Sequence, residues 1–154
     1  MITVIRVGLI FIIGILSIQL AKSREIREII VHTTDANINC GAECINKMHV
    51  AKGWDSCGYH KIVMVDGSVE DCRPFQVIGA HVRGFNTTSV GVAWAGQGLP
   101  SKLQYDSLRK LVKSLMKRFN LSSKQVHGHK EYSTSGTKTC PNINMNTFRG
   151  LLNE

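Results

Sequence analysis

The chain of 154 residues has the length of one domain, which leaves room for a hydrophobic core but not for two independent ones. Its formal net charge is +8 at pH 7, and a basic surface favours an anionic partner such as nucleic acid, anionic lipid or an acidic cell-wall polymer. The sequence has no basic stripe rich in aromatic residues, of the kind that stacks nucleic-acid bases, and no repeat or low-complexity tract. Charge alone does not choose among the other partners.

Residues 1–23 have the features of a secretory signal. The apolar stretch at 7–21 follows a basic residue and is too short for a typical membrane span. Ala21 and Ser23 place small residues at the two positions that a signal peptidase reads. We therefore expect cleavage after Ser23, a secreted mature domain at residues 24–154 in the extracellular space or the periplasm, and no stable membrane insertion after cleavage. An uncleaved membrane anchor stays open as the alternative.

The cysteine count matters if the protein is exported. Five cysteines are present, at positions 40, 44, 57, 72 and 140. An oxidising compartment favours disulfides, and an odd number leaves one thiol over. One of the five cysteines therefore needs another role.

The first half of the mature chain predicts a strand, a helix and a hairpin. Residues 28–34 are β-branched and mostly apolar, which predicts a strand with His32 near its end. Apolar positions at loose helical spacing predict a helix over residues 41–52. Two β-type runs then flank Asp66-Gly67, the strongest short hairpin signal in a sequence.

The second half predicts two more strands and two helices. Residues 89–95 have the pattern of a buried strand, and residues 102–119 place seven apolar side chains on one helical face with lysines and arginines opposite. A short strand at 125–127 and a terminal helix at 145–152 complete the pattern. Strands separated by helices predict a single α/β domain, with a mixed central β-sheet flanked by helices.

The polar stretch HGHKEYSTSGTKTCP at residues 127–141 contains candidate metal ligands. A catalytic zinc site usually takes three ligands from His, Cys and carboxylate and keeps a position for water. His129 and Cys140, together with His32, are the right types, provided that the loop between the first two folds back. Alternate side chains of an extended segment share a face, so Lys138 would project beside Cys140 toward whatever the metal holds.

Spacing alone leaves other interpretations open for each residue. A single histidine at a strand end, such as His32, is more often structural than a ligand. His127 and His129 are two positions apart and could share a face, so spacing does not say which one binds. Cys140 could be half of a disulfide, which is the usual state of an exported cysteine.

Four segments, taken together, are similar to a known family. In order they are VHTT, GYHKIVMVDGSVEDCRP, IGAHVRGFNTTSVGV and HGHKEYSTSGTKTCP. They resemble the zinc-dependent N-acetylmuramoyl-L-alanine amidases, which share a fold with the phage amidase-type lysozymes and the animal peptidoglycan recognition proteins. The resemblance covers about residues 28–150, and it is specific because four separated blocks match in order and spacing.

The resemblance implies roles for the residues that match the family's motifs. It implies that Zn²⁺ is bound by His32, His129 and Cys140, and so favours His129 over His127. It implies that Tyr59 flanks the zinc-bound water and that Lys138 stabilises the oxyanion. His81 and Asn86 match groove positions associated with substrate binding, whereas His60 is expected to serve structure. Local disulfides in the animal relatives suggest a Cys40–Cys44 bridge, which leaves Cys57 and Cys72 as a second pair.

The implied function is hydrolysis of the amide bond between N-acetylmuramic acid and L-alanine in bacterial peptidoglycan or muropeptides. Carboxylates and phosphates of the cell wall fit the basic charge, whereas export removes nucleic acid as a partner. We expect a monomer. A non-catalytic peptidoglycan sensor of the same fold is the alternative, although such members typically replace the cysteine ligand. A small disulfide-stapled structural or toxin-like domain is a second alternative, and it needs Cys140 in a bridge.

Overall fold

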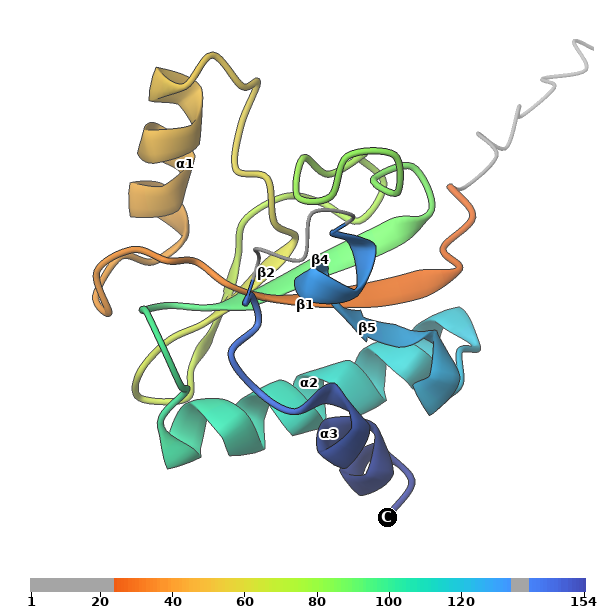
Figure 1. The fold of residues 1–154 in the computed structure, drawn as a ribbon. Coiled ribbons are helices and arrows are strands. Elements are labelled where there is room, and N and C mark those ends of the chain that lie inside the picture. Colours follow the sequence, from red (N-terminus) through yellow and green to blue (C-terminus); the bar gives the residue numbers. More distant parts are fainter. Residues whose placement is uncertain (1–23, 134–138) are drawn as a thin grey trace, which may run out of the picture.

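The computed structural model describes residues 24–133 and 139–154 (Figure 1). The expected signal segment and the predicted catalytic Lys138 lie outside the described residues. In chain order the elements are β1 (Glu28–Thr33), α1 (Ala42–Ala51), β2 (Lys61–Val63), β3 (Val69–Asp71), β4 (Ser89–Trp94), α2 (Lys102–Phe119), the 3-10 turn η1 (Ser123–Gln125), β5 (Val126–Gly128), the 3-10 turn η2 (His129–Tyr132) and α3 (Met145–Leu152). Every helix and strand that the sequence predicts is present.

One mixed sheet forms the centre of the domain. Its strand order is β3-β2-β4-β1-β5, with β2, β4, β1 and β5 parallel and β3 antiparallel to β2. The predicted hairpin joins β2 and β3: Gly67 has φ 84°, a region that favours glycine, and Asp66 Oδ1 accepts the Ser68 N–H at 2.9 Å. Because four strands are parallel, their carboxyl ends meet at one edge, where open α/β sheets place their ligand sites.

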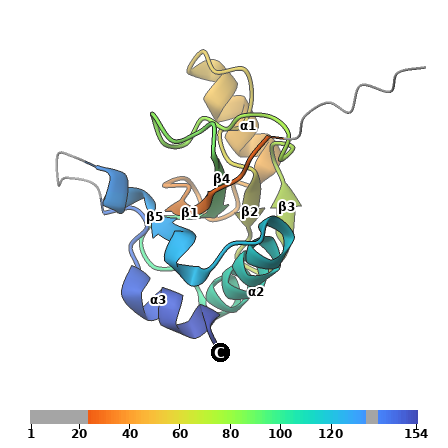
Figure 2. The same ribbon diagram turned by 90° about the vertical axis from the view of Figure 1, so that its right-hand side faces the viewer.

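The two faces of the sheet pack against different elements. Ile29 and Val31 belong to the core cluster that contains the buried apolar residues of α2 and α3, and these two helices lie on one side of the sheet with α1 on the other (Figures 1 and 2). Successive strand residues point to opposite faces. His32 therefore points away from α2, toward the side that carries α1.

α2 has the bounds that its sequence pattern predicts. Leu108, Val112 and Leu115 recur at helical spacing and are buried against the sheet. Ser101 and Gln104 form a capping box at its first turn, which satisfies backbone N–H groups that have no partner inside the helix. Within residues 24–133 and 139–154, no helix is long and apolar enough to cross a membrane.

Both predicted disulfides are confirmed. Cys40 is bonded to Cys44 at the start of α1, and Cys57 is bonded to Cys72 beside the β2–β3 hairpin. Cys140 belongs to neither bridge. The alternative of a small disulfide-stapled structural or toxin-like domain needs Cys140 in a bridge, and the two bridges use the other four cysteines.

Candidate metal centre

Three side chains from distant parts of the chain converge at the carboxyl edge of the sheet. His32 is the fifth residue of β1, His129 begins η2 directly after β5, and Cys140 follows the loop beyond η2. β1 and β5 are parallel neighbours, with Val31 opposite Gly128, so their ends lie side by side. One ligand atom from each of the three side chains lies within 4.8 Å of the other two. The structure thus brings together all three predicted metal ligands.

Backbone contacts hold Cys140 beside the strand ends. The Lys130 N–H donates to the carbonyl oxygen of Cys140 at 2.5 Å, which closes the loop between η2 and the cysteine. The N–H of Thr33 donates to Cys140 Sγ at 3.4 Å. Pro141, which follows Cys140, packs closely against Gly128, because a Cβ at Gly128 would lie 2.6 Å from Pro141 Cδ. One main-chain group therefore holds the sulfur of Cys140, and a second holds its backbone.

The donor set, two imidazoles and one thiol, fits a tetrahedral zinc ion. Zn–N bonds of about 2.0–2.1 Å and Zn–S bonds of about 2.3 Å place neighbouring ligand atoms roughly 3.3–3.6 Å apart. His32 Nδ1 lies 3.9 Å from Cys140 Sγ, and all three ligand atoms lie within 4.8 Å of one another. The side chains would therefore move closer by up to roughly 1.5 Å to bind one ion. Three protein ligands of this kind leave the fourth position for water or substrate, as in catalytic zinc sites.

Tyr59 stands next to the three ligand residues. Its ring centroid lies 5.1 Å from that of His32. Burial raises the pKa of the Tyr59 phenol well above its usual range, and the nearby Cys140 and Asp35 add to the shift because negative charge disfavours the phenolate. At neutral pH the hydroxyl is therefore protonated and can donate a hydrogen bond.

Two cavities meet at the metal centre. One, of about 530 Å³, is lined by Thr33, Thr34, Asp35, Lys52, Tyr59, His129, Thr139, Cys140 and Asn142. The other, of about 420 Å³, is lined by Trp54, Tyr59, Ala80, His81, Val82, Arg83, Gly84, Asn86 and His129. Tyr59 and His129 line both, so the two cavities adjoin at the metal centre.

Comparison with known proteins identifies the family. A family model described as N-acetylmuramoyl-L-alanine amidase matches residues 22–143. The endolysin of Klebsiella phage KP32 is 32% identical over 139 residues, which cover 83% of this chain and 88% of the endolysin. The chain belongs to the N-acetylmuramoyl-L-alanine amidase family.

Solved structures and animal relatives agree with this assignment. The N-acetylmuramoyl-L-alanine amidase LysC from Clostridium intestinale URNW has a TM-score of 0.74 and 27% sequence identity, covering 84% of this chain and 86% of its own. Peptidoglycan-recognition protein SC2 of Drosophila simulans is 27% identical over 128 residues, which cover 76% of this chain and 68% of the relative. The predicted family, the predicted α/β fold and the predicted class of enzyme, an amidase acting on the N-acetylmuramoyl-L-alanine bond, are confirmed.

The two predicted substrate residues line the smaller cavity, but Oδ1 of Asn86 and both ring nitrogens of His81 face protein atoms. Asn86 Oδ1 accepts the backbone N–H groups of His81 and Val82, at 2.9 and 2.8 Å. Asn86 thereby shapes the loop that forms the cavity wall. His81 is buried, and both of its ring nitrogens face protein atoms, His32 Nε2 at 3.1 Å and Ser89 Oγ at 3.3 Å. Direct substrate binding by these two residues stays a prediction.

The remaining histidines divide between core and surface. His60 is fully buried, accepts the Gly91 N–H at 3.0 Å through Nδ1, and approaches the Val77 carbonyl at 3.1 Å through Nε2, which fits the structural role expected for it. Burial lowers the pKa of His60 to about 4, so this ring is neutral at pH 7. His127 lies in β5, and its Nδ1 is 3.9 Å from Glu131.

The sequence did not reveal several residues of the cavity walls. Trp54 and Arg83 line the smaller cavity, and Lys52 and Asn142 line the larger one. An aromatic side chain in a polar loop was the available signal for Trp54. Arg83 lies inside a segment that resembles the family, yet no motif position marks it.

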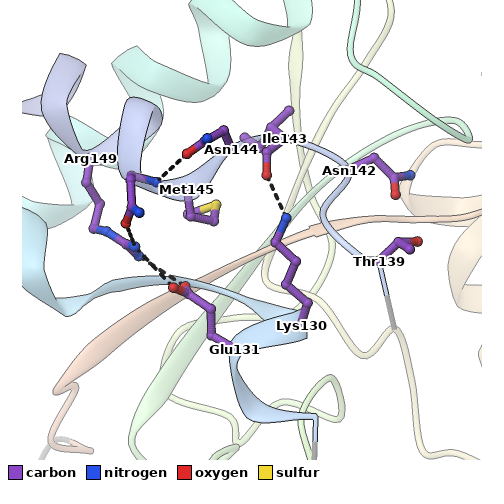
Figure 3. A pocket seen from close by; sticks show the side chains of 9 residues that line it. Lys130, Glu131, Thr139, Asn142, Ile143, Asn144, Met145 and Arg149 are labelled. Atoms are coloured by element: carbon purple, nitrogen blue, oxygen red, sulfur yellow. Dashed lines mark hydrogen bonds and ion pairs between the residues drawn. The ribbon is translucent and has the colours of Figure 1, made fainter. Parts of the chain in front are cut away.

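A further cavity, of about 590 Å³, lies beside α3 and is lined by none of the three ligand residues (Figure 3). Its charged groups bind each other and the backbone: Arg149 donates to both carboxylate oxygens of Glu131, at 3.0 and 3.1 Å, and Lys130 Nζ donates to Ile143 O at 2.9 Å. Glu131 also accepts the Gly128 N–H at 2.6 Å. This network supports η2, and thereby the position of His129 at its start.

Proposed function

We propose that the protein hydrolyses the amide bond between the lactyl group of N-acetylmuramic acid and L-alanine in peptidoglycan, with zinc held by His32, His129 and Cys140. The observation that carries the proposal is the convergence of these ligand atoms within 4.8 Å, next to Tyr59, in a member of the amidase family. The three ligand side chains offer two neutral imidazoles and one thiolate, which zinc prefers.

Zinc bound at this position would lower the pKa of a water molecule from about 15.7 to about 7 and polarise the scissile carbonyl. The protein's own groups would complete the site. The Thr33 N–H stabilises the negative sulfur of Cys140 by donating to it. The protonated Tyr59 hydroxyl can donate to the attacking oxygen, because its raised pKa keeps the proton in place.

Lys138 is the proposed donor for the oxyanion that develops on the scissile carbonyl. It precedes Cys140 by two positions, and it matches the residue to which the family resemblance assigns this role. Removing a single oxyanion donor typically costs about 3–4 kcal/mol of transition-state stabilisation. We therefore expect loss of Lys138 to lower kcat with little effect on zinc binding.

The two cavities would accommodate the substrate on either side of the cleaved bond. Lys52 in the larger cavity and Arg83 in the smaller one supply positive charge, which fits the carboxylates of a peptidoglycan stem peptide. We also propose that the substrate is met outside the cytoplasm, after residues 1–23 have directed export and been removed, and that the mature domain acts as a monomer.

A peptidoglycan sensor that does not cleave its ligand is the second candidate, because one relative is named a peptidoglycan-recognition protein, a name that describes binding. The complete His32, His129 and Cys140 set argues for hydrolysis, since a sensor needs a groove but no ligand for activated water. The two candidates share a substrate and differ in whether it is cleaved.

Digestion of purified muropeptides tests the proposal. The zinc-loaded protein is incubated with muropeptides with and without a chelator, and mass spectrometry reads the products. We expect separate glycan and peptide fragments from the zinc-loaded sample and none with chelator. Muropeptides that stay intact while binding is measurable would support the sensor instead.

A further inference from the structure

His32 faces two different environments through its two ring nitrogens. Nδ1 lies 3.9 Å from Cys140 Sγ, on the side of the metal centre. Nε2 lies on the inner side, 3.1 Å from Nδ1 of His81. The two rings are close to perpendicular, at 88°, with centroids 5.1 Å apart. His32, a ligand of the proposed metal, is therefore hydrogen-bonded through its other ring nitrogen to His81.

Metal binding assigns a single direction to the hydrogen bonds behind His32. A neutral imidazole that binds a cation through Nδ1 carries its proton on Nε2, so His32 donates and His81 Nδ1 accepts. The proton of His81 is then on Nε2, 3.3 Å from Ser89 Oγ. Ser89 in turn donates to the Phe85 carbonyl at 2.7 Å, which leaves a lone pair for His81. With these assignments, each hydrogen bond in the chain from His32 through His81 and Ser89 to the Phe85 carbonyl has one donor and one acceptor.

Packing fixes His81 in the orientation that this chain of bonds needs. Gly79 and Gly91 contact its ring, and a Cβ at either position would lie 2.6 Å from Cδ2 of His81. Gly91 is inside β4, where glycine lacks a side chain to pack. The space that this glycine leaves is filled by the His81 ring. The backbone N–H of His81 is also held, by Asn86 Oδ1.

We propose that His81 is a positioning residue that fixes the tautomer and rotation of the metal ligand His32, through the bond to His32 Nε2. The inference rests on the metal site proposed above. It gives His81 a function inside the protein, in place of a direct contact with substrate. Loss of a group that orients a metal-bound histidine typically lowers metal affinity by about 10–100-fold.

A pair of variants separates the hydrogen bond from the volume of the side chain. His81→Leu keeps close to the volume of histidine but removes the acceptor, whereas His81→Asn is smaller but can place Oδ1 where Nδ1 accepts. We measure the zinc dissociation constant by competition with a chromophoric chelator. We expect it to rise about 10–100-fold in His81→Leu, and to stay closer to the native value than to the leucine variant in His81→Asn. Equal zinc affinity in native protein and a folded His81→Leu variant overturns the proposal.

The native protein provides a test that needs no folded variant. Long-range ¹H–¹⁵N spectra of the zinc-loaded protein report which nitrogen of each histidine carries a proton. We expect His32 and His81 both to be protonated at Nε2. A proton on Nδ1 of His81 would reverse the bond and rule out the positioning role.

These readouts distinguish this inference from the proposed function. Zinc affinity and tautomers are measured without hydrolysis, so a zinc-loaded protein that fails to cleave muropeptides removes the proposed function and leaves the role of His81 intact. A rise in KM in His81→Leu with unchanged zinc affinity would instead support direct substrate binding. Native protein that binds no zinc would overturn both proposals.

Discussion

The N–H of Thr33 donates to the sulfur of Cys140 at 3.4 Å, although 107 positions of the sequence separate the two residues. Thr33 ends β1 and directly follows His32. A backbone donor stabilises negative charge on a sulfur and so favours the thiolate that binds metals. The end of β1 therefore supplies the candidate ligand His32, and the neighbouring Thr33 N–H orients a second candidate ligand, Cys140.

Cys140→Ser should abolish zinc binding and hydrolysis while leaving the fold intact. A serine hydroxyl stays protonated at neutral pH and is a poor zinc ligand compared with a thiolate. Cys140 is in neither disulfide, so its replacement breaks no cross-link. Zinc content after dialysis, circular dichroism and muropeptide digestion check the prediction. Undiminished hydrolysis by this variant would show that Cys140 is not a ligand of the catalytic metal.

Tyr59→Phe should lower kcat and leave zinc affinity and KM close to native. The change removes only the hydroxyl and keeps the ring that packs against His32. A preorganised hydrogen-bond donor at a reacting oxygen typically contributes about 10²–10³-fold to kcat. Steady-state kinetics on a defined muropeptide, together with a zinc titration, separate the two effects. An unchanged kcat would assign Tyr59 a packing role alone.

Folding stability of the metal-free protein should fall as the pH drops from about 6.5 toward 4. Burial lowers the folded-state pKa of His60 from 6.5 to about 4, so in this window the unfolded chain binds the extra proton. His60 therefore contributes stability that is present above pH 6.5 and is lost as the pH falls, at most about 3 kcal/mol. Urea unfolding at several pH values measures this slope.

His60→Asn provides the matched variant for this measurement. Asparagine cannot gain a proton in this range, and its Oδ1 can take the place of Nδ1, which accepts the Gly91 N–H at 3.0 Å in the native protein. Burial also lowers the pKa of His81, to about 3, so part of the slope should persist. We expect a smaller pH dependence in the variant. If the free energy of unfolding changes with pH equally in the variant and the native protein, His60 is not the neutral buried group proposed here.

Removing the Cys57–Cys72 disulfide should destabilise the domain more than removing Cys40–Cys44. The chain-entropy model gives about 3 kcal/mol for a loop of 15 residues and about 2 kcal/mol for one of 4, the separations of these two bridges. Paired Cys→Ser variants and urea unfolding measure the difference. Comparable losses from the two pairs would mean that contacts other than loop closure dominate.

The sequence predicted the elements of the fold because their patterns are local. The apolar face of residues 102–119 and the Asp66-Gly67 turn each determine their own segment, and α2 and the hairpin follow them. The contact between His32 and His81 joins residues 49 positions apart, and it depends on glycines that leave space for the ring. No pattern within a short window carries that information.

The choice between His127 and His129 shows the same limit at closer range. Residues two positions apart on an extended strand point to the same face, so spacing could not distinguish the two histidines. In the structure β5 ends at Gly128 and η2 begins at His129. The chain turns at this point, so that His129 joins the other ligands while His127 lies near Glu131. The family resemblance favoured His129, whereas periodicity could not.

Gly128→Ala should lower both stability and zinc affinity, although alanine suits the local backbone. Gly128 has φ −94° and ψ 149°, a conformation open to any residue. The added Cβ would lie 2.6 Å from Pro141 Cδ and 2.9 Å from Met145 Cγ, so the proline must move and take the adjacent Cys140 with it. Overpacking of this kind typically costs about 1–3 kcal/mol.

Gly150→Ala is the control for this variant. A Cβ at Gly150 meets nothing within 4 Å, and alanine in a helix is favoured over glycine by about 1 kcal/mol. We therefore expect Gly150→Ala to gain stability with unchanged zinc affinity, and Gly128→Ala to lose both, in urea unfolding and chelator competition. A Gly128→Ala protein that binds zinc as tightly as the native chain would show that Cys140 holds its place without the close packing of Pro141.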